Sequence, residues 1–334
     1  MLTERSSSLH GARALCWSLC VSLSLASCSV SRETPSAAPL APISVSEMQR
    51  LYRGLPLHRA PGLPGHRAAR TWLDEEVSAL GLAGEWSPAS PPAWDGPALA
   101  NLELRLNASP SKPLLLLVCH YDSVPASPGA DDNGSGTVGL LALARRLAPR
   151  NLPVEIGLVF FDGEELGLLG SRRYAQALPD RERERLIGVI NLETIAYRDT
   201  RPGSQELPPG FELLLDPGDV GDFLAVVGNM ASQDLADAVA LGLTSLPPER
   251  LRTVAYSGVP GNGWLVPDTR RSDHASFWDI DVPAVMLTDT ANFRNPHYHR
   301  SSDRVETLDL EFLVAVLQGV ERSVLLLAEE AADG

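Results

Sequence analysis

The chain has 334 residues, of which 44% are hydrophobic, and its formal net charge is −14 at pH 7. This length and composition allow one large globular domain or two small ones. So negative a surface repels phosphates, which excludes nucleic acid as a partner and leaves anionic lipid headgroups without an electrostatic attraction.

The first 27 residues have the pattern of a bacterial export signal. Arg5 and Arg13 precede an apolar run that has the length of a signal peptide and is short for a membrane span. The run ends in LASC at 25–28, which resembles the lipobox of bacterial lipoproteins and implies cleavage before Cys28 and lipidation of that cysteine. An ordinary signal peptide is the alternative. We therefore expect an exported lipoprotein of the cell envelope, at the outer membrane or facing the periplasm, that meets the membrane only through its lipid.

The rest of the chain divides into a tether and one domain. Residues 28–45 are rich in proline, alanine and serine, a composition typical of a tether. Residues 46–334 show no internal repeat and nothing that marks a second globular domain. Cys119 is the single cysteine of this domain, so we expect no internal disulfide.

From residue 64 onward, helical and strand patterns alternate. We expect helices over 64–80, 135–148, 166–178, 231–243 and 307–330, and strands over 98–106, 113–121, 154–161, 186–197, 223–229 and 282–288. Residues 85–98 are expected to be proline-rich loop, and 199–221 and 244–268 surface loops at the rim of a cleft. Continuous apolar strands alternating with helices indicate an α/β fold, a three-layer α/β/α sandwich with a mostly parallel central sheet.

Polar residues follow several of the expected strands. In such a sheet, ligands bind at the carboxyl ends of the strands. The side chains found there are His120, Asp122, Asp132, Glu164, Glu165, Glu193, Tyr298 and His299. Each alone is common in turns, caps and helix starts. Together they would bring several like charges into one crevice, which is unstable without a counter-charge. A divalent metal ion would supply that charge.

Five motifs in a fixed order carry a resemblance to a known family. They are HYDS at 120–123, GADDNGSG at 129–136, FFDGEELGLLGS at 160–171, NLET at 191–194 and YHRSSD at 298–303. This series resembles the two-zinc aminopeptidase family of secreted bacterial leucine aminopeptidases, to which the glutaminyl cyclases are related. The resemblance covers about residues 64–328, and it implies that 46–334 form a catalytic domain acting on peptides.

The resemblance also implies a set of metal ligands. His120 and Glu193 would bind one ion, Glu165 and His299 the other, and Asp132 would bridge them. Each ion would then have three protein ligands and open positions, as a catalytic site requires. Two Zn²⁺ ions are expected, with Co²⁺ or Mn²⁺ as possible substitutes.

Three further expectations concern the surroundings of these ligands. Asp122 would lie behind His120 and orient it. The peptide bond between Asp132 and Asn133 is a candidate for the cis bond that follows the bridging aspartate in the family. The family's best-known members have aspartate where this chain has Glu193, which leaves the metal spacing open.

The catalytic roles follow from the same resemblance. Glu164 would be the general base that activates a water, and the hydroxyl of Tyr298 would stabilise the oxyanion. Arg271, Asp273 and His274 would line the substrate pocket or support it, the alternative being a salt bridge and cap at a helix start.

Aminopeptidase activity, with an apolar first residue in the substrate, is the first expectation. A glutaminyl cyclase with a single zinc is the closest alternative. A binding lipoprotein without catalytic activity is less favoured, because all five ligand positions and the base are present. The oligomeric state is not indicated.

Overall fold

The computed structural model describes residues 41–209, 211 and 215–333. The expected signal at 1–27, Cys28 and most of the tether lie outside these residues and stay predictions. The compact unit begins at Ala41, five residues before the predicted domain start at 46. Ile43 is 2% exposed and already packs in the core, which is why the folded unit starts this early. None of the described helices combines the length and hydropathy that crossing a bilayer requires.

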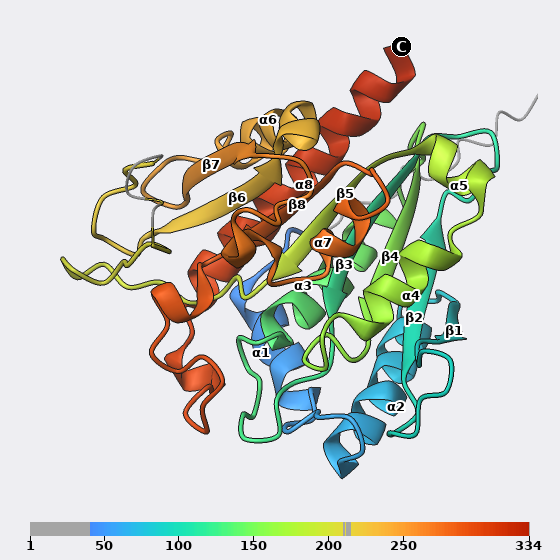
Figure 1. The fold of residues 1–334 in the computed structure, drawn as a ribbon, viewed down its shortest axis with the longest axis horizontal. Coiled ribbons are helices and arrows are strands. Elements are labelled where there is room, and N and C mark those ends of the chain that lie inside the picture. The colour runs from blue at the N-terminus through green and yellow to red at the C-terminus, as the bar shows by residue number, and fades with distance from the viewer. Residues whose placement is uncertain (1–40, 210, 212–214, 334) are drawn as a thin grey trace, which may run out of the picture. The chain divides into compact units, whose positions relative to one another are not determined.

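The described strands form one eight-stranded mixed sheet in the order β1-β2-β4-β3-β5-β8-β6-β7 (Figure 1). Their bounds are β1 Gly84–Pro88, β2 Ala100–Leu106, β3 Leu114–His120, β4 Glu155–Phe161, β5 Leu186–Glu193, β6 Phe223–Asn229, β7 Arg252–Val259 and β8 Ala284–Thr288. The central strands β4, β3, β5 and β8 run parallel. The pairs β1–β2, β2–β4 and β6–β8 are antiparallel, and β6–β7 is parallel.

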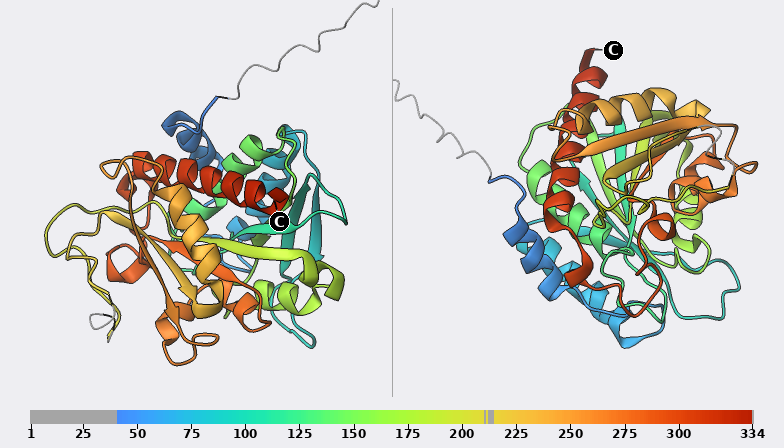
Figure 2. Two further views of the ribbon diagram at one scale, coloured as in Figure 1. Left: turned by 90° about the horizontal axis from the view of Figure 1, so that it is seen from above. Right: turned by 90° about the vertical axis from the view of Figure 1, so that its left-hand side faces the viewer.

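Helices cover both faces of the sheet (Figure 2). They are α1 Val45–Gly54, α2 Pro64–Ala79, α3 Gly134–Leu147, α4 Leu169–Ala177, α5 Asp180–Arg185, α6 Gln233–Leu243, α7 His274–Trp278 and α8 Leu310–Asp333. The larger hydrophobic core lies under α1, α2, α3, α6 and α8, and the smaller one under α4 and α7. The predicted three-layer α/β/α sandwich with a mostly parallel sheet is therefore confirmed.

Strand β3 shows how the apolar sequence produces two cores. Leu115 and Leu117 face the larger core, whereas Leu116 and Val118 face the smaller one. Every residue of β3 is buried, because side chains alternate between faces and both faces are covered. Because β3 is buried along its whole length, its last residue, His120, is held rigidly at the carboxyl end of the strand.

Two of the described strands and three of the described α-helices were not predicted. Strand β7 lies inside 244–268, which was expected to be a surface loop, so that expectation was wrong for these residues. It pairs with β6 alone and is mostly half-buried, so its sequence lacks the continuous apolar run of a central strand. Strand β1 likewise overlaps the start of the expected proline-rich loop at 85–98. The unpredicted helices are α1, α5 and α7.

Two predicted elements are shorter than expected. The strand over 186–197 ends at Glu193, and the helix over 166–178 begins at Leu169. The residues before α4 form a turn instead, in which the carbonyl of Glu164 accepts the N–H groups of Gly167 and Leu168. This turn, between β4 and α4, carries both adjacent glutamates.

Candidate metal centre

Four neighbouring strands deliver the predicted ligands to one edge of the sheet. Strand β3 ends at His120 and β5 ends at Glu193. Strand β4 leads into the turn with Glu165, and β8 leads into the loop with His299. Because β4, β3, β5 and β8 are adjacent and parallel, their carboxyl ends meet. Asp132 joins them from the turn before α3.

The first group of side chains surrounds His120. Its Nε2 lies 3.3 Å from Oε2 of Glu193, 3.5 Å from Oδ1 of Asp132 and 3.9 Å from Oε2 of Glu164. Ligand atoms of His120, Glu164 and Glu193 lie within 4.8 Å of one another and could hold a metal ion. By distance alone, Glu164 could therefore also bind a metal ion held by His120 and Glu193, although the sequence did not predict it as a ligand.

The second group surrounds His299. Its Nε2 lies 3.0 Å from Oδ2 of Asp132 and 3.2 Å from Oε2 of Glu165, and these three residues also form a set that could hold a metal ion. Asp132 thus turns one carboxylate oxygen to each imidazole, which is the arrangement expected of a bridging ligand. The His299 side chain is 39% exposed while that of His120 is fully buried, so the centre opens on the His299 side.

The side chains present fit a pair of metal ions. Nε2 of His120, Nε2 of His299 and Oδ2 of Asp132 are buried atoms without a hydrogen-bond partner. Buried polar atoms are rarely left unpaired, since each costs free energy. Two imidazoles and several carboxylates, with no thiolate, form a donor set that suits zinc and also cobalt or manganese.

The electrostatics of the centre also favour a bound cation. Burial, together with the charge of Glu165, raises the pKa of Asp132 to about 7. Burial also raises the pKa of Glu164 well above its ordinary value. Burial opposes the charged form of His120, but the carboxylates of Glu193 and Glu164 outweigh it and raise its pKa. These raised pKa values mean that the metal-free centre binds protons to reduce the repulsion between its carboxylates. A bound cation would neutralise the same carboxylates in their place.

Asp122 connects the two motifs that carry most of the centre. Its Oδ1 lies 3.3 Å from Nδ1 of His120, as expected for the residue that orients this ligand. Its two oxygens also accept the backbone N–H groups of Glu164 and Glu165, each at 3.2 Å. One buried carboxylate therefore lies against the imidazole and holds the turn that bears both glutamates.

Glu193 is held by a residue that sequence reasoning missed. The hydroxyl of Ser272 donates to Oε2 of Glu193 at 2.7 Å, and Asn191 donates to that hydroxyl at 2.6 Å. The glutamate side chain is thereby held in place. Nothing in the sequence paired Ser272 with a residue 79 positions away.

The turn that bears Asp132 is fixed from the far end of the chain. Oδ1 of Asp303 accepts the N–H of Asp131 at 2.9 Å, and its Oδ2 accepts that of Asp132 at 3.2 Å. The peptide bond between Asp132 and Asn133 is cis, as expected from the resemblance. The side chain of Asn133 then caps α3 by accepting the N–H of Gly136.

Arg59 is a second residue that the sequence did not reveal. It is completely buried, and its guanidinium donates to the carbonyls of Tyr121 at 2.6 Å and Gly129 at 2.7 Å. Both carbonyls lie in the loop between β3 and α3, one directly after His120 and the other three residues before Asp132. Arg59 thus holds this loop at two points. No spacing or motif indicated this, because the contact spans more than 60 residues.

The three residues expected at the substrate pocket have different places. Arg271 is exposed and lines a cavity beside the centre. His274 does not bind there: it is fully buried, and its Nε2 lies 2.7 Å from the carbonyl oxygen of Thr269, so it supports the pocket wall. Asp273 is also fully buried, and neither of its carboxylate oxygens has a hydrogen-bond partner.

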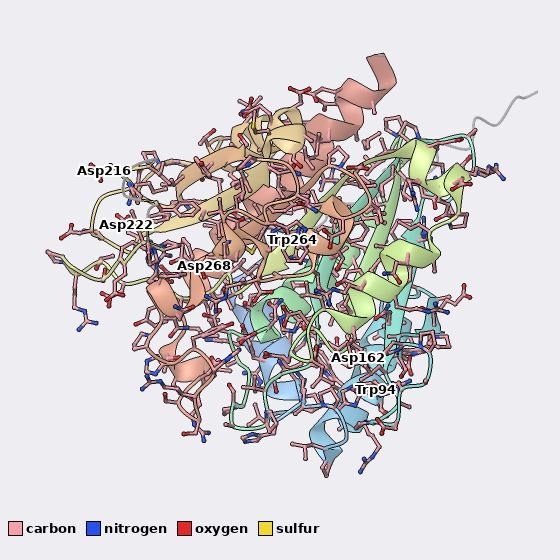
Figure 3. All side chains as sticks on the ribbon, viewed as in Figure 1. Trp94, Asp162, Asp216, Asp222, Trp264 and Asp268 are labelled. Atoms are coloured by element: carbon pink, nitrogen blue, oxygen red, sulfur yellow. The ribbon has the colours of Figure 1, made fainter. Side chains whose placement is uncertain are left out.

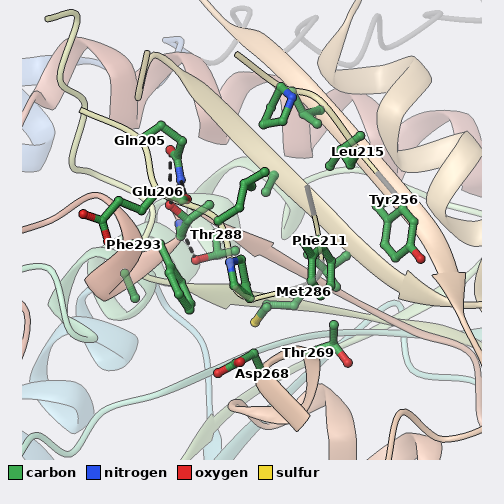
Figure 4. Close-up of a pocket in the computed structure, with 18 of the residues that line it drawn as sticks. Gln205, Glu206, Phe211, Leu215, Tyr256, Asp268, Thr269, Met286, Thr288 and Phe293 are labelled. Atoms are coloured by element: carbon green, nitrogen blue, oxygen red, sulfur yellow. Dashed lines mark hydrogen bonds between the residues drawn. The ribbon is translucent and has the colours of Figure 1, made fainter. Parts of the chain in front are cut away.

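An apolar cavity of about 100 Å³ adjoins the centre (Figure 4). Glu193 and Tyr298 are among its lining residues. Its floor is the sheet surface of β6, β7 and β8, where alternate residues point to one face: Phe223, Ala225, Val227, Val254, Tyr256, Met286 and Thr288. Helix α6 packs against the same three strands, and short 3-10 helices at Pro267–Arg270 and Ala291–Phe293 contribute to the cavity wall. Phe211 and Leu215 close one side and Phe293 another.

Comparison with known proteins places the motifs in a family. Residues 101–218 match the model of Peptidase family M28. The chain is 37% identical over 217 residues to the uncharacterized protein YfbL of Escherichia coli, an alignment that covers 62% of this chain and 65% of YfbL. It is 45% identical over 82 residues to aminopeptidase YwaD of Bacillus subtilis, covering 25% of this chain and 18% of YwaD. The aligned parts thus span less than two thirds of either relative.

Solved structures share the fold at lower identity. The LapA aminopeptidase of Legionella pneumophila superposes with a TM-score of 0.64 at 19% identity, covering 85% of this chain and 70% of LapA. The glutaminyl cyclase of Porphyromonas gingivalis superposes with a TM-score of 0.62 at 21% identity, covering 84% of this chain and 96% of that protein. The resemblance drawn from the motifs is therefore confirmed, and both branches of it share this architecture.

Proposed function

We propose, from the premise that the chain belongs to Peptidase family M28, that it is a metal-dependent aminopeptidase releasing amino-terminal residues with apolar side chains. The observation that carries the proposal is the apolar cavity beside two sets of side chains that could hold metal ions and that Asp132 joins. A cavity of this volume takes one side chain, which suits an enzyme that removes a single residue.

Five residues would hold the metal ions: His120, Asp132, Glu165, Glu193 and His299. When bound, zinc lowers the pKa of a coordinated water and polarises a substrate carbonyl. Zinc is the first choice for this donor set, and cobalt or manganese could replace it.

Glu164 would be the general base. Its carboxylate lies at the edge of the first ligand set, 3.9 Å from Nε2 of His120 and farther away than Glu193 or Asp132. It would take a proton from the attacking water and deliver it to the leaving amine.

Tyr298 would donate a hydrogen bond to the carbonyl oxygen as negative charge develops there. Burial, with the nearby charge of Asp132, raises the pKa of the Tyr298 hydroxyl, so the proton stays on the donor. Its ring stacks on the imidazole of His299, with ring centroids 3.9 Å apart and an interplanar angle of 14°, which fixes the hydroxyl beside the centre.

An activity screen with metal analysis tests the proposal. Purified, zinc-loaded protein should cleave leucine and phenylalanine amides and short peptides with free amino termini, and should leave amino-terminally blocked peptides intact. Metal analysis should find about two ions per chain. Intact amides and peptides would refute the aminopeptidase assignment. Cyclisation of amino-terminal glutamine with one ion per chain would instead support the glutaminyl cyclase alternative.

A further inference from the structure

Two large apolar side chains stand in solvent shortly before the segment that lines the cavity. Leu265 is 84% exposed and Trp264 is 64% exposed. Single exposed apolar residues are common on protein surfaces. An adjacent tryptophan and leucine are less so, and tryptophan is among the residues that contribute most to binding interfaces.

The loop that carries this pair is held in place. The guanidinium of Arg270 lies 4.0 Å from the ring centroid of Trp264. Arg270 is 8% exposed; it donates to both carboxylate oxygens of Asp279, at 2.9 and 2.8 Å, and to the carbonyl of Asn262. The indole therefore rests on a buried, ion-paired cation. An ordered aromatic side chain loses little conformational entropy when it binds a partner.

The pair is directly connected to the wall of the cavity. The N–H of Val266 bonds to the carbonyl of Gly263, and the N–H of Thr269 bonds to that of Val266, so the chain turns tightly from the exposed pair into the next segment. Asp268 and Thr269 in that segment line the cavity (Figure 4), and Figure 3 labels Trp264 and Asp268 on the whole fold. Trp264 and Leu265 thus lie on the segment that leads directly into the cavity wall.

We propose that Trp264 and Leu265 form a subsite for apolar side chains of the substrate that follow the scissile bond. The proposal rests on the aminopeptidase function proposed above. The cavity holds the side chain of the residue to be removed, so the rest of the peptide has to extend across the cavity mouth. There the ordered indole and the neighbouring leucine offer apolar surface to the second and third residues. The enzyme would therefore favour peptides with apolar residues at those positions.

Three substrates that share one amino-terminal residue test the subsite. They are leucine amide, Leu-Gly-Gly and Leu-Leu-Phe, each assayed with zinc-loaded full-length protein. For the unaltered protein we expect kcat/KM to be highest for Leu-Leu-Phe. The double variant Trp264→Ala/Leu265→Ala should lose about tenfold in kcat/KM for Leu-Leu-Phe, mainly through KM, and less than about twofold for leucine amide. Trp264→Phe, which keeps an aromatic ring, should retain most of the preference.

Leu241→Ala is the matched control, because Leu241 is 59% exposed on α6, which packs against α8 in the opposite helical layer. It should leave all three rates unchanged. Equal losses on the amide and the tripeptide in the double variant, or no loss on either, would overturn the subsite while the aminopeptidase assignment stands. An unaltered protein that cleaves none of the three substrates would overturn both. The thermal unfolding midpoint and the zinc content of each variant establish that it is folded and loaded.

Discussion

Glu164 and Glu165 are adjacent in the sequence but have different surroundings. Oε2 of Glu165 faces His299 at 3.2 Å and its Oε1 accepts the N–H of Val124 at 3.1 Å. Glu164 instead lies beside His120. The turn after β4 separates the two side chains, and Asp122 fixes both of their backbone N–H groups. Neighbouring carboxylates can therefore serve two roles within one centre.

Replacement of Glu164 by glutamine tests its role as the base. The amide keeps the size of the side chain but cannot accept the proton, so kcat should fall by about 10²- to 10⁴-fold. Because the ligands in the proposed set remain, zinc content should stay near two ions per chain. Steady-state kinetics and metal analysis measure both quantities. Loss of one ion together with activity would show that Glu164 is a ligand instead.

Arg59 should matter for metal affinity although it touches no ligand side chain. Lysine at this position keeps the charge but cannot bond to the carbonyls of both Tyr121 and Gly129. Arg59→Lys should therefore weaken zinc binding by about 10- to 100-fold, the effect typical of residues behind metal ligands. Chelator competition measures this affinity.

The control for this variant is Arg50→Lys, since Arg50 forms an exposed ion pair with Glu76 on the surface. That variant should bind zinc as the unaltered protein does. Unchanged zinc affinity in a folded Arg59→Lys protein would mean that the guanidinium only supports the fold.

The two halves of the sheet have different functions. The parallel strands β4, β3, β5 and β8 supply the metal-ligating side chains at their carboxyl ends. Strands β6 and β7, with β8, supply the floor of the cavity from alternate residues. Phe211 and Phe293 also line the cavity, beside that floor.

Ala225 on β6 offers a way to fill the cavity. It is 8% exposed, lines the cavity and lies opposite Thr288 of β8. Ala225→Phe should lower kcat/KM for leucine and phenylalanine amides by at least about tenfold and spare alanine amide, because a filled pocket excludes large side chains. Ala225→Val should give a smaller shift in the same direction. An unchanged order of preference in folded variants would mean that this cavity does not receive the first residue.

At the scale of the whole molecule, metal and protons compete for the same buried groups. The folded-state pKa of Asp132 is raised to about 7 and that of His299 to about 10. Burial raises the first; the carboxylates of Asp132 and Glu165 raise the second against the opposing effect of burial. When folding raises the pKa of a group, that group stabilises the folded state at a pH below its pKa in the unfolded chain. This contribution to the free energy of unfolding is lost as the pH rises through the pKa in the folded state.

In the metal-free protein, the contribution of Asp132 to the free energy of unfolding should therefore be lost between about pH 4 and 7. That of His299 should be lost between about pH 6.5 and 10. Zinc requires deprotonated ligands and binds better as pH rises. The rise in unfolding midpoint on adding zinc should thus grow from about pH 5 to pH 8. Calorimetry with and without chelator measures it, and the acidic residues outside the centre cancel in the difference. A zinc-induced rise that is constant or shrinks over this range would contradict the prediction.

Much of the centre was already determined by the sequence. Apolar runs define the central strands, and polar residues at the end of a buried strand have to meet at the carboxyl edge of a parallel sheet. The family resemblance carried by the motifs then implied His120, Asp132, Glu165, Glu193 and His299 as ligands, and the structure brings all five together.

Only the tertiary structure decided the supporting contacts and the cavity. Ser272 beside Glu193, Asp303 beside Asp132 and Arg59 against the loop between β3 and α3 are separated from their partners by some 60 to 170 residues. Such pairs leave no local periodicity or spacing. The edge strand β7 also lacks a continuous apolar run, so the cavity floor could not be found before β6, β7 and β8 were placed side by side. Local patterns fix what each element is, whereas contacts distant in sequence depend on how the elements pack.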